Sequence, residues 1–145
     1  IGGDKNAEKE AKVEKIPNMV LLKARLLFDG GYYERAFKLL EKRTIADFET
    51  QKDQLEYAYR LARLTHNTGK HDEAIMYYQT TIDQGKEASY YFACNAALQI
   101  GRIYESKKNL NKAKEFFNLC LSIKPDEYRN SLHQKAKAGL NRINN

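Results

Sequence analysis

Residues 97–125 read ALQIGRIYESKKNLNKAKEFFNLCLSIKP. Apolar residues recur every three or four positions on both sides of a polar break at residues 107–109, which indicates two helices joined by a tight turn. The small residues Gly101 and Ala113 lie where the two helices would touch, so their backbones can approach closely. The stretch therefore predicts an antiparallel helical hairpin.

The same pattern occurs twice more toward the N-terminus. Ala36, Ala74 and Ala113 occupy one position in three second helices, at offsets of 38 and 39 residues. A period in this range is typical of a stacked array of helical hairpins, which is a binding scaffold more often than an enzyme. The matching small residues of the three first helices are Ala24, Ala62 and Gly101.

The last copy resembles the tetratricopeptide repeat in residue type and spacing. The likeness covers roughly residues 17–125, and it is weaker in the earlier copies, which depart from the pattern at Thr65 and His71 and at Lys23 and Arg43. It implies an all-α, right-handed superhelical array of antiparallel helix hairpins. The nine positions that carry the resemblance are Ala97, Ile100, Gly101, Tyr104, Leu110, Ala113, Phe117, Cys120 and Pro125.

The chain is expected to divide into a lead-in, three hairpins and a cap. The charged residues 1–16 form a solvated helix or a disordered segment that ends near Pro17. After Pro125, Asp126 is expected to cap a last helix that shields the end of the array. The hairpins are expected at about 17–50, 51–87 and 88–125, with the cap at 126–145.

Within these hairpins, Gly31 and Gly69 break the helices. The repeats exceed 34 residues, and the alignment places the extra residues between hairpins, near 44–50 and 83–88, although longer first helices would also absorb them. The expected helices are 18–29 and 33–44, 51–67 and 71–84, and 88–107 and 110–123.

Composition agrees with one soluble domain. At 145 residues the chain can bury a substantial core, and it has no apolar run of about 20 residues that would span a membrane. Because it begins at Ile1 rather than Met, we expect it to be the C-terminal part of a longer protein, and the compartment is not assigned. Its ten tyrosines are expected to lie mostly in the core.

The net charge of +6 arises within residues 102–145, which hold ten Lys and Arg against four acids. A basic end of this kind can meet nucleic acid, an anionic membrane or an acidic protein. Nucleic-acid binding is not expected, because basic and aromatic residues do not interleave as a stacking platform requires. A solvated helix face is the simpler interpretation.

Catalysis and cofactors find no support in the sequence. His66, His71 and His133 show no metal-ligand spacing, and there is no phosphate-binding glycine loop or nucleophile elbow. We therefore predict no enzyme activity, no metal and no cofactor. Cys94 and Cys120 are interpreted as two packed thiols in preference to a disulfide.

The resemblance also locates a candidate binding surface. In this family ligands usually lie along the concave face made by the first helices, and one position of that face is Arg25, Arg63 and Arg102 in the three copies. If these helices lie about 10 Å apart, an extended peptide rising about 3.3 Å per residue would present an acidic side chain to each arginine at every third residue. The hypothesis is a clamp for an acidic or phosphorylated segment.

Four further residues are assigned to this groove. His66 and Asn67 lie one turn from Arg63 on the expected helix, and Tyr59 and Phe28 are expected on the same face as apolar anchors. The competing interpretation is that the arginines form intrahelical pairs, Arg25 with Asp29 and Arg102 with Glu105, each worth only about 0.3–0.5 kcal/mol.

A chaperone carboxylate clamp is not predicted. Repeat proteins of that subtype use lysine, asparagine and arginine at five positions of their first helices, and none of the five matches here. The residues at those positions are Leu21, Arg25, Arg60, Asn95 and Gln99.

We therefore expect a noncatalytic scaffold that binds a peptide or a partner protein segment. Two alternatives remain. The chain is a structural module that packs against the rest of its own longer protein, or it self-associates through its N-terminal face around Val20, Leu26 and Leu39, which nothing comparable to the C-terminal helix protects.

Overall fold

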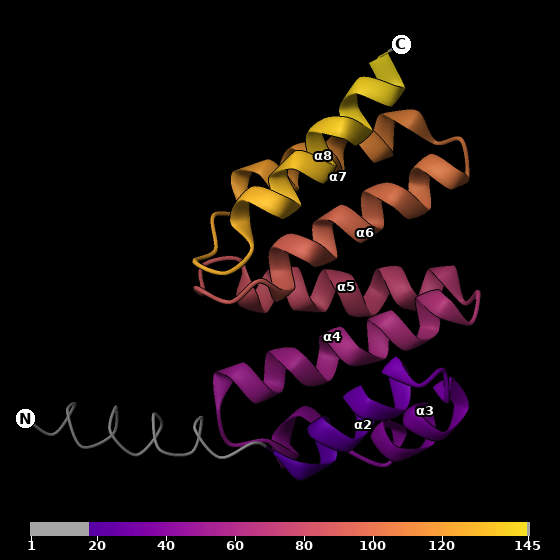
Figure 1. Ribbon diagram of the computed structural model, residues 1–145, viewed down its shortest axis with the longest axis vertical. Coiled ribbons are helices and arrows are strands. Elements are labelled where there is room, and N and C mark those ends of the chain that lie inside the picture. Colours follow the sequence, from indigo (N-terminus) through magenta and orange to yellow (C-terminus); the bar gives the residue numbers. More distant parts are fainter. Residues whose placement is uncertain (1–17, 145) are drawn as a thin grey trace, which may run out of the picture.

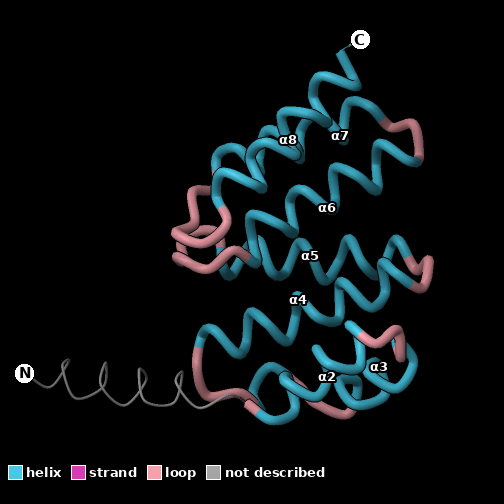
Figure 2. The backbone as a smooth tube through the Cα atoms, in the orientation of Figure 1, coloured by secondary structure: helices cyan, strands magenta, loops and turns pink. Residues whose placement is uncertain are grey.

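The computed structural model describes residues 18–144, and this part of the chain is all-helical, without strands. The lead-in predicted at residues 1–16 lies outside the described residues. Consecutive helices pair as α2 with α3, α4 with α5, and α6 with α7, and α8 covers the last pair by packing on α7 and α6 (Figures 1 and 2). The predicted array of helical hairpins is confirmed. The elements are α2 (Met19–Asp29), α3 (Tyr33–Glu41), the short 3-10 helix η1 (Ile45–Asp47), α4 (Gln51–Asn67), α5 (His71–Gly85), α6 (Phe92–Ser106), α7 (Leu110–Ser122) and α8 (Arg129–Asn144).

The three hairpin turns share one geometry. Gly31, Gly69 and Lys108 each adopt a positive φ, of 84°, 79° and 64°. In each case the next residue donates its N–H to the carbonyl five residues back, at 2.8, 2.8 and 2.9 Å, which ends the first helix with a left-handed cap. The two glycines were predicted as hairpin breaks. In the third hairpin, Lys108 adopts the conformation that glycine favours.

Side chains cap three of the helices at their N-termini. Asn18 accepts hydrogen bonds from the first turn of α2, Thr50 from Asp53 of α4, and Asn109 from Lys112 of α7, at distances between 3.0 and 3.2 Å. These bonds satisfy amide groups that have no partner within the helix. The local sequence thus determines where α2, α4 and α7 begin.

Three expected boundaries are wrong by several residues. Helix α3 ends at Glu41 instead of 44, because Thr44 and Asp47 form a capping box that begins η1. Helix α6 begins at Phe92 instead of 88, after a loop that follows Gly85. The extra residues of the first two repeats thus lie largely between hairpins, at 42–50 and 86–91, as the alignment placed them.

The last helix also begins later than expected. Asp126 does not cap it: α8 begins at Arg129, and Tyr128 accepts the first helical bond from the N–H of Leu132 at 3.0 Å. The N–H of Asp126 instead donates to the carbonyl of Ser89 at 2.8 Å. This bond joins the loop before α6 to the loop before α8, and so delays the start of the helix.

Small residues are buried at the predicted helix contacts. All six of the repeated alanine and glycine positions are buried, and one apolar residue of each second helix, Leu40, Tyr78 or Phe117, is completely enclosed. The prediction for the tyrosines is only partly right. Tyr57, Tyr59 and Tyr78 are in the core, but Tyr32 and Tyr128 are exposed and the others are half-buried.

Cys94 and Cys120 are both buried free thiols, with their Sγ atoms 3.6 Å apart. The two sulfur atoms are in contact without a covalent bond, so the thiols contribute to the packing of α6 on α7. This arrangement agrees with the interpretation of two packed thiols.

Candidate functional site

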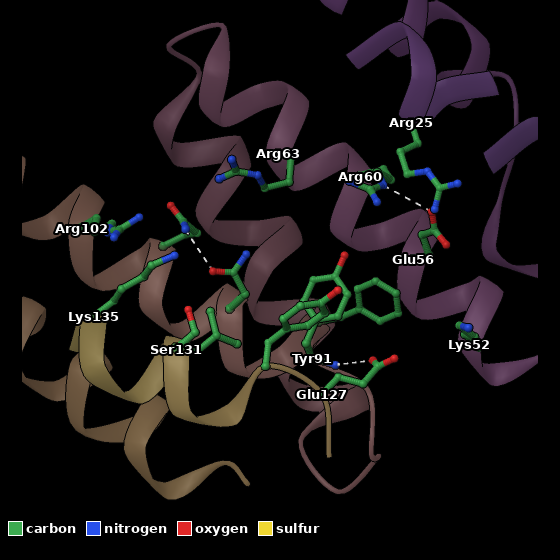
Figure 3. Close-up of a pocket in the computed structure, with 15 residues that line it drawn as sticks. Arg25, Lys52, Glu56, Arg60, Arg63, Tyr91, Arg102, Glu127, Ser131 and Lys135 are labelled. Carbon is green, nitrogen blue, oxygen red and sulfur yellow. Dashed lines mark hydrogen bonds and ion pairs between the residues drawn. The ribbon is translucent and has the colours of Figure 1, made fainter. Parts of the chain in front are cut away.

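The first helices of the three hairpins and α8 together line an open polar cavity of about 590 Å³, which we call the groove (Figure 3). One side is made by α2 and α4, and the other by α6, α8 and the loops that precede them. Six cationic side chains line it against two acids, so the cavity carries a strong excess of positive charge. The cations are Arg25, Lys52, Arg60, Arg63, Arg102 and Lys135, and the acids are Glu56 and Glu127.

The structure brings the three predicted arginines to this one cavity. Arg25 and Arg102 are exposed, whereas Arg63 is half-buried between them along the array. Nη1 of Arg63 donates to the hydroxyl of Tyr78 at 3.3 Å, and its guanidinium lies 5.7 Å from the ring centre of Phe28. Arg63 is therefore fixed by two neighbours, whereas the other two arginines are exposed.

The competing intrahelical pairs do not form. No ion pair joins Arg25 to Asp29, and Glu105 binds Arg142 of α8 through two bonds of 2.9 Å instead of Arg102. Among residues 18–144, neither Arg25 nor Arg102 forms an ion pair with an acid. Their charges are available to a ligand.

Tyr59 is not an anchor on the groove surface. Its side chain is 4% exposed and packs edge-on against Tyr78 and Tyr91, with ring centres 6.5 and 5.7 Å away. Phe28 also lies outside the cavity lining; it is half-buried and packs on Tyr33 at 5.2 Å. Tyr59 belongs to the core between the second and third hairpins, and Phe28 packs within the first hairpin.

His66 and Asn67 also lie away from the cavity, at the end of α4. Asn67 is exposed, and Nδ1 of His66 lies 3.0 Å from the hydroxyl of Tyr78, which belongs to α5. Burial, together with the charge of Arg63, lowers the pKa of His66 to about 4. The one-turn spacing from Arg63 placed His66 on the groove in the sequence interpretation, but the side chain turns toward its own hairpin partner.

The two acids of the cavity are already engaged. Glu56 pairs with Nε of Arg60 at 3.3 Å, and Oε1 of Glu127 accepts the backbone N–H of Tyr91 at 3.2 Å. Burial raises the pKa of Tyr91 to about 12, so its hydroxyl stays neutral at physiological pH. The acids thus neutralise little of the remaining cationic surface, which suits the binding of an anionic group.

Comparison with known proteins assigns the family. Residues 53–126 match the tetratricopeptide repeat, and this match spans half of the chain. The chain belongs to the tetratricopeptide repeat family. Comparisons with curated proteins and with solved structures gave no match.

Tetratricopeptide repeats are generally noncatalytic modules for binding other proteins, and this is the function class that the family supports. Within the described residues no cluster of His, Cys, Asp or Glu is arranged to hold a metal ion. None of the helices between residues 18 and 144 has the length and apolar character needed to cross a bilayer.

Several cavity residues of the tetratricopeptide array were not assigned to the groove from the sequence, although Asn95 and Gln99 occupy two of the chaperone-clamp positions. Asn95 and Gln99 form a chain of amides, in which Gln99 donates to Asn95 at 3.1 Å and Asn95 donates to the hydroxyl of Tyr59. Ser131 and Lys135 come from α8, which takes the place of a further first helix. The position of α8 in the array could have predicted these two residues, because it puts one face of the capping helix on the concave side.

Proposed function

We propose that the cavity binds an extended acidic segment of a partner protein. The observation that carries the proposal is the arginine row: Arg25, Arg63 and Arg102, one from each hairpin, line a single cavity in which cations outnumber acids by six to two. A segment with carboxylates or phosphates at intervals of about three residues would meet successive arginines, since neighbouring helices pack about 10 Å apart. Bidentate contacts from the guanidinium groups would fix its register.

The amide chain supports a segment with an exposed backbone. The bonds from Gln99 to Asn95 and from Asn95 to Tyr59 hold the two amides in fixed orientations beside Arg102. Amides held in this way recognise peptide N–H and C=O groups without a large loss of side-chain entropy. Recognition would then combine charged contacts from the arginines with polar contacts to the peptide backbone.

The test is fluorescence anisotropy with a labelled peptide that carries Glu at every third position and with its Gln counterpart. In the groove variant Arg102→Glu/Lys135→Glu, binding of the Glu peptide should weaken at least about tenfold. The matched control is Lys114→Glu/Lys137→Glu, which changes the same charge at two exposed residues outside the cavity and should bind as wild type does. Equal binding by both variants, or equal affinity for the Glu and Gln peptides, would overturn the proposal.

A second candidate function is packing against another part of a longer chain, or self-association. It is favoured by the N-terminal hairpin, where Met19 and Leu26 are 70% and 60% exposed. Sedimentation velocity over a range of protein concentrations tests self-association directly, because a dimer formed through this hairpin would grow with concentration and would be weakened by Leu26→Gln.

A further inference from the structure

A second charged hollow, separate from the groove, lies on the outer face of the first hairpin. It lies between α2 and α3 and has a volume of about 390 Å³. This hairpin is at the opposite end of the array from α8 (Figure 1). Five cations line it, and no acid does. They are Lys23, Arg35, Lys38, Lys42 and Arg43.

The charge of this hollow is uncompensated within residues 18–144. None of its five cations forms an ion pair with a described residue, whereas Lys107, Arg129 and Arg142 elsewhere each have an acidic partner. Arg35 lies over the ring of Tyr32 at 5.3 Å, which holds the guanidinium without reducing its charge. Five like charges around one small hollow repel each other, so a ligand with several negative charges would be attracted and would relieve this repulsion.

The floor of the hollow is apolar. Leu27 of α2 and Leu39 of α3 lie between the cations, and both are half-buried. A ligand that fills the hollow therefore binds more tightly if it presents apolar side chains between its acidic groups. No aromatic ring lines the hollow, which argues against single-stranded nucleic acid, because its bases need stacking partners.

Within the array, α3 packs against α4, and α5 packs against α6. The N-terminal side of the second hairpin and that of the third are therefore each covered by a helix of the hairpin before. On the first hairpin the described residues place no helix there (Figures 1 and 2). A helix with apolar residues at positions i, i+3, i+4 and i+7 would lay them on the leucine floor and direct its flanking residues to the cationic rim.

We propose that the outer face of the first hairpin is a docking site for an acidic amphipathic helix of a partner protein. Leucine-type side chains of that helix lie on Leu27 and Leu39, and its carboxylates pair with Lys23, Lys38 and Lys42. This site is independent of the groove, since the two cavities share no residue. One chain can therefore bind two segments at once.

The probe is a labelled synthetic helix of about 18 residues with leucines on one face and glutamates beside them. Its control is a peptide of the same composition with the leucines distributed around the helix. Lys38→Glu/Lys42→Glu should weaken binding of the amphipathic probe at least about tenfold, and the distributed peptide should bind wild type at least about tenfold more weakly. Both substituted lysines are exposed, and circular dichroism checks that the fold is kept.

Two control variants separate this site from the groove. Lys114→Glu/Lys137→Glu and the groove variant Arg102→Glu/Lys135→Glu should both bind the probe as wild type does. Loss of binding in the groove variant, or equal affinity for the two peptides, would overturn the proposal. So would a concentration-dependent dimer of the unliganded protein that Lys38→Glu/Lys42→Glu dissociates, because the face would then belong to a second copy of the chain.

Discussion

The backbone of Gly101 lies directly against the ring of Phe117. A Cβ atom added at Gly101 would lie 2.7 Å from the ring carbons Cδ1 and Cε1, a distance that real Cβ atoms do not adopt. Gly139 of α8 meets the same ring from the other side, where an added Cβ would lie 2.6 Å from Cζ. The fully buried ring thus occupies a space that two glycines leave open between α6 and α8.

Gly101→Ala is expected to destabilise the protein. Alanine favours the helix by about 0.5–1 kcal/mol, but overpacking against an enclosed ring costs about 1–3 kcal/mol. The net loss should appear as a lower urea midpoint with an unchanged slope. Asn118→Ala, at an exposed position of α7, is the control and should be neutral or slightly stabilising. A Gly101→Ala protein as stable as wild type would show that the Phe117 ring can move aside without a loss of stability.

Tyr59→Phe is expected to lower the free energy of unfolding by about 1–2 kcal/mol, because it leaves the Asn95 amide without its acceptor in a largely buried setting. The double variant Tyr59→Phe/Asn95→Ala removes both partners, so its free energy of unfolding should fall by less than the sum of the decreases in the two single variants. Urea unfolding of the four proteins measures this coupling. Strict additivity would show that the bond contributes nothing.

Much of the fold was predictable because its determinants are local and repeated. The alanines at 36, 74 and 113 marked the hairpin contacts, and Gly31 and Gly69 marked two of the turns. The start of α8 was not predictable, because it depends on a bond between Asp126 and Ser89, which are far apart in the sequence. The 3-10 helix after α3 has a local signal in its capping box, yet the longer apolar pattern outweighed it.

The lining of the candidate site was predictable to the extent that one position repeats in each hairpin. That rule found Arg25, Arg63 and Arg102, which all line the cavity. The one-turn spacing from Arg63 failed for Tyr59, because such a spacing does not tell which side of a half-buried helix the neighbouring hairpin covers. The repeated position also missed Lys135, because α8 carries no repeat pattern of its own and joins the cavity only through its packing on α6.

Stability should fall as the pH decreases from about 6.5 to about 4. Burial first, then the charges of Arg63, His71 and Arg102, lowers the pKa of His66 to about 4 from an unfolded value near 6.5. In this window the unfolded chain binds the extra proton, so stability is fully present above the window and is lost as the pH falls through it. Nδ1 of His66 lies 3.0 Å from the hydroxyl of Tyr78, and protonation of the ring removes the lone pair with which Nδ1 can accept that O–H.

The measurement for His66 is the urea midpoint at pH 7.5 and at pH 5, for wild type and for His66→Asn. The variant should show a smaller difference between the two pH values, because it removes the titrating group. A proton NMR titration of the His66 ring gives an independent check. A midpoint near 6.5 in the folded protein would contradict the expected shift.

An ion pair between Arg142 and Glu105 attaches the capping helix α8 to α6. Arg142 of α8 donates from Nε and Nη2 to the two carboxylate oxygens of Glu105 in α6, both at 2.9 Å, and this pairing lowers the pKa of Glu105. The bond joins residues 37 apart in the sequence, so it resists the fraying of α8 from the array. Because both side chains are partly exposed, the coupling free energy should be only about 0.5–1 kcal/mol.

A double-mutant cycle with Arg142→Ala and Glu105→Ala measures that coupling, and the exposed pair of Lys112 and Glu115, at 3.5 Å within α7, is the control. Two parallel bonds between helices should give a larger coupling than one bond within a helix. Arg142→Lys should lose most of it, since an ammonium group cannot make the paired contact. The coupling should also weaken as the pH falls through the lowered pKa of Glu105, because the pair stabilises the folded state only while the carboxylate is ionised. Equal coupling in the two pairs would mean that α8 is held by its apolar face alone.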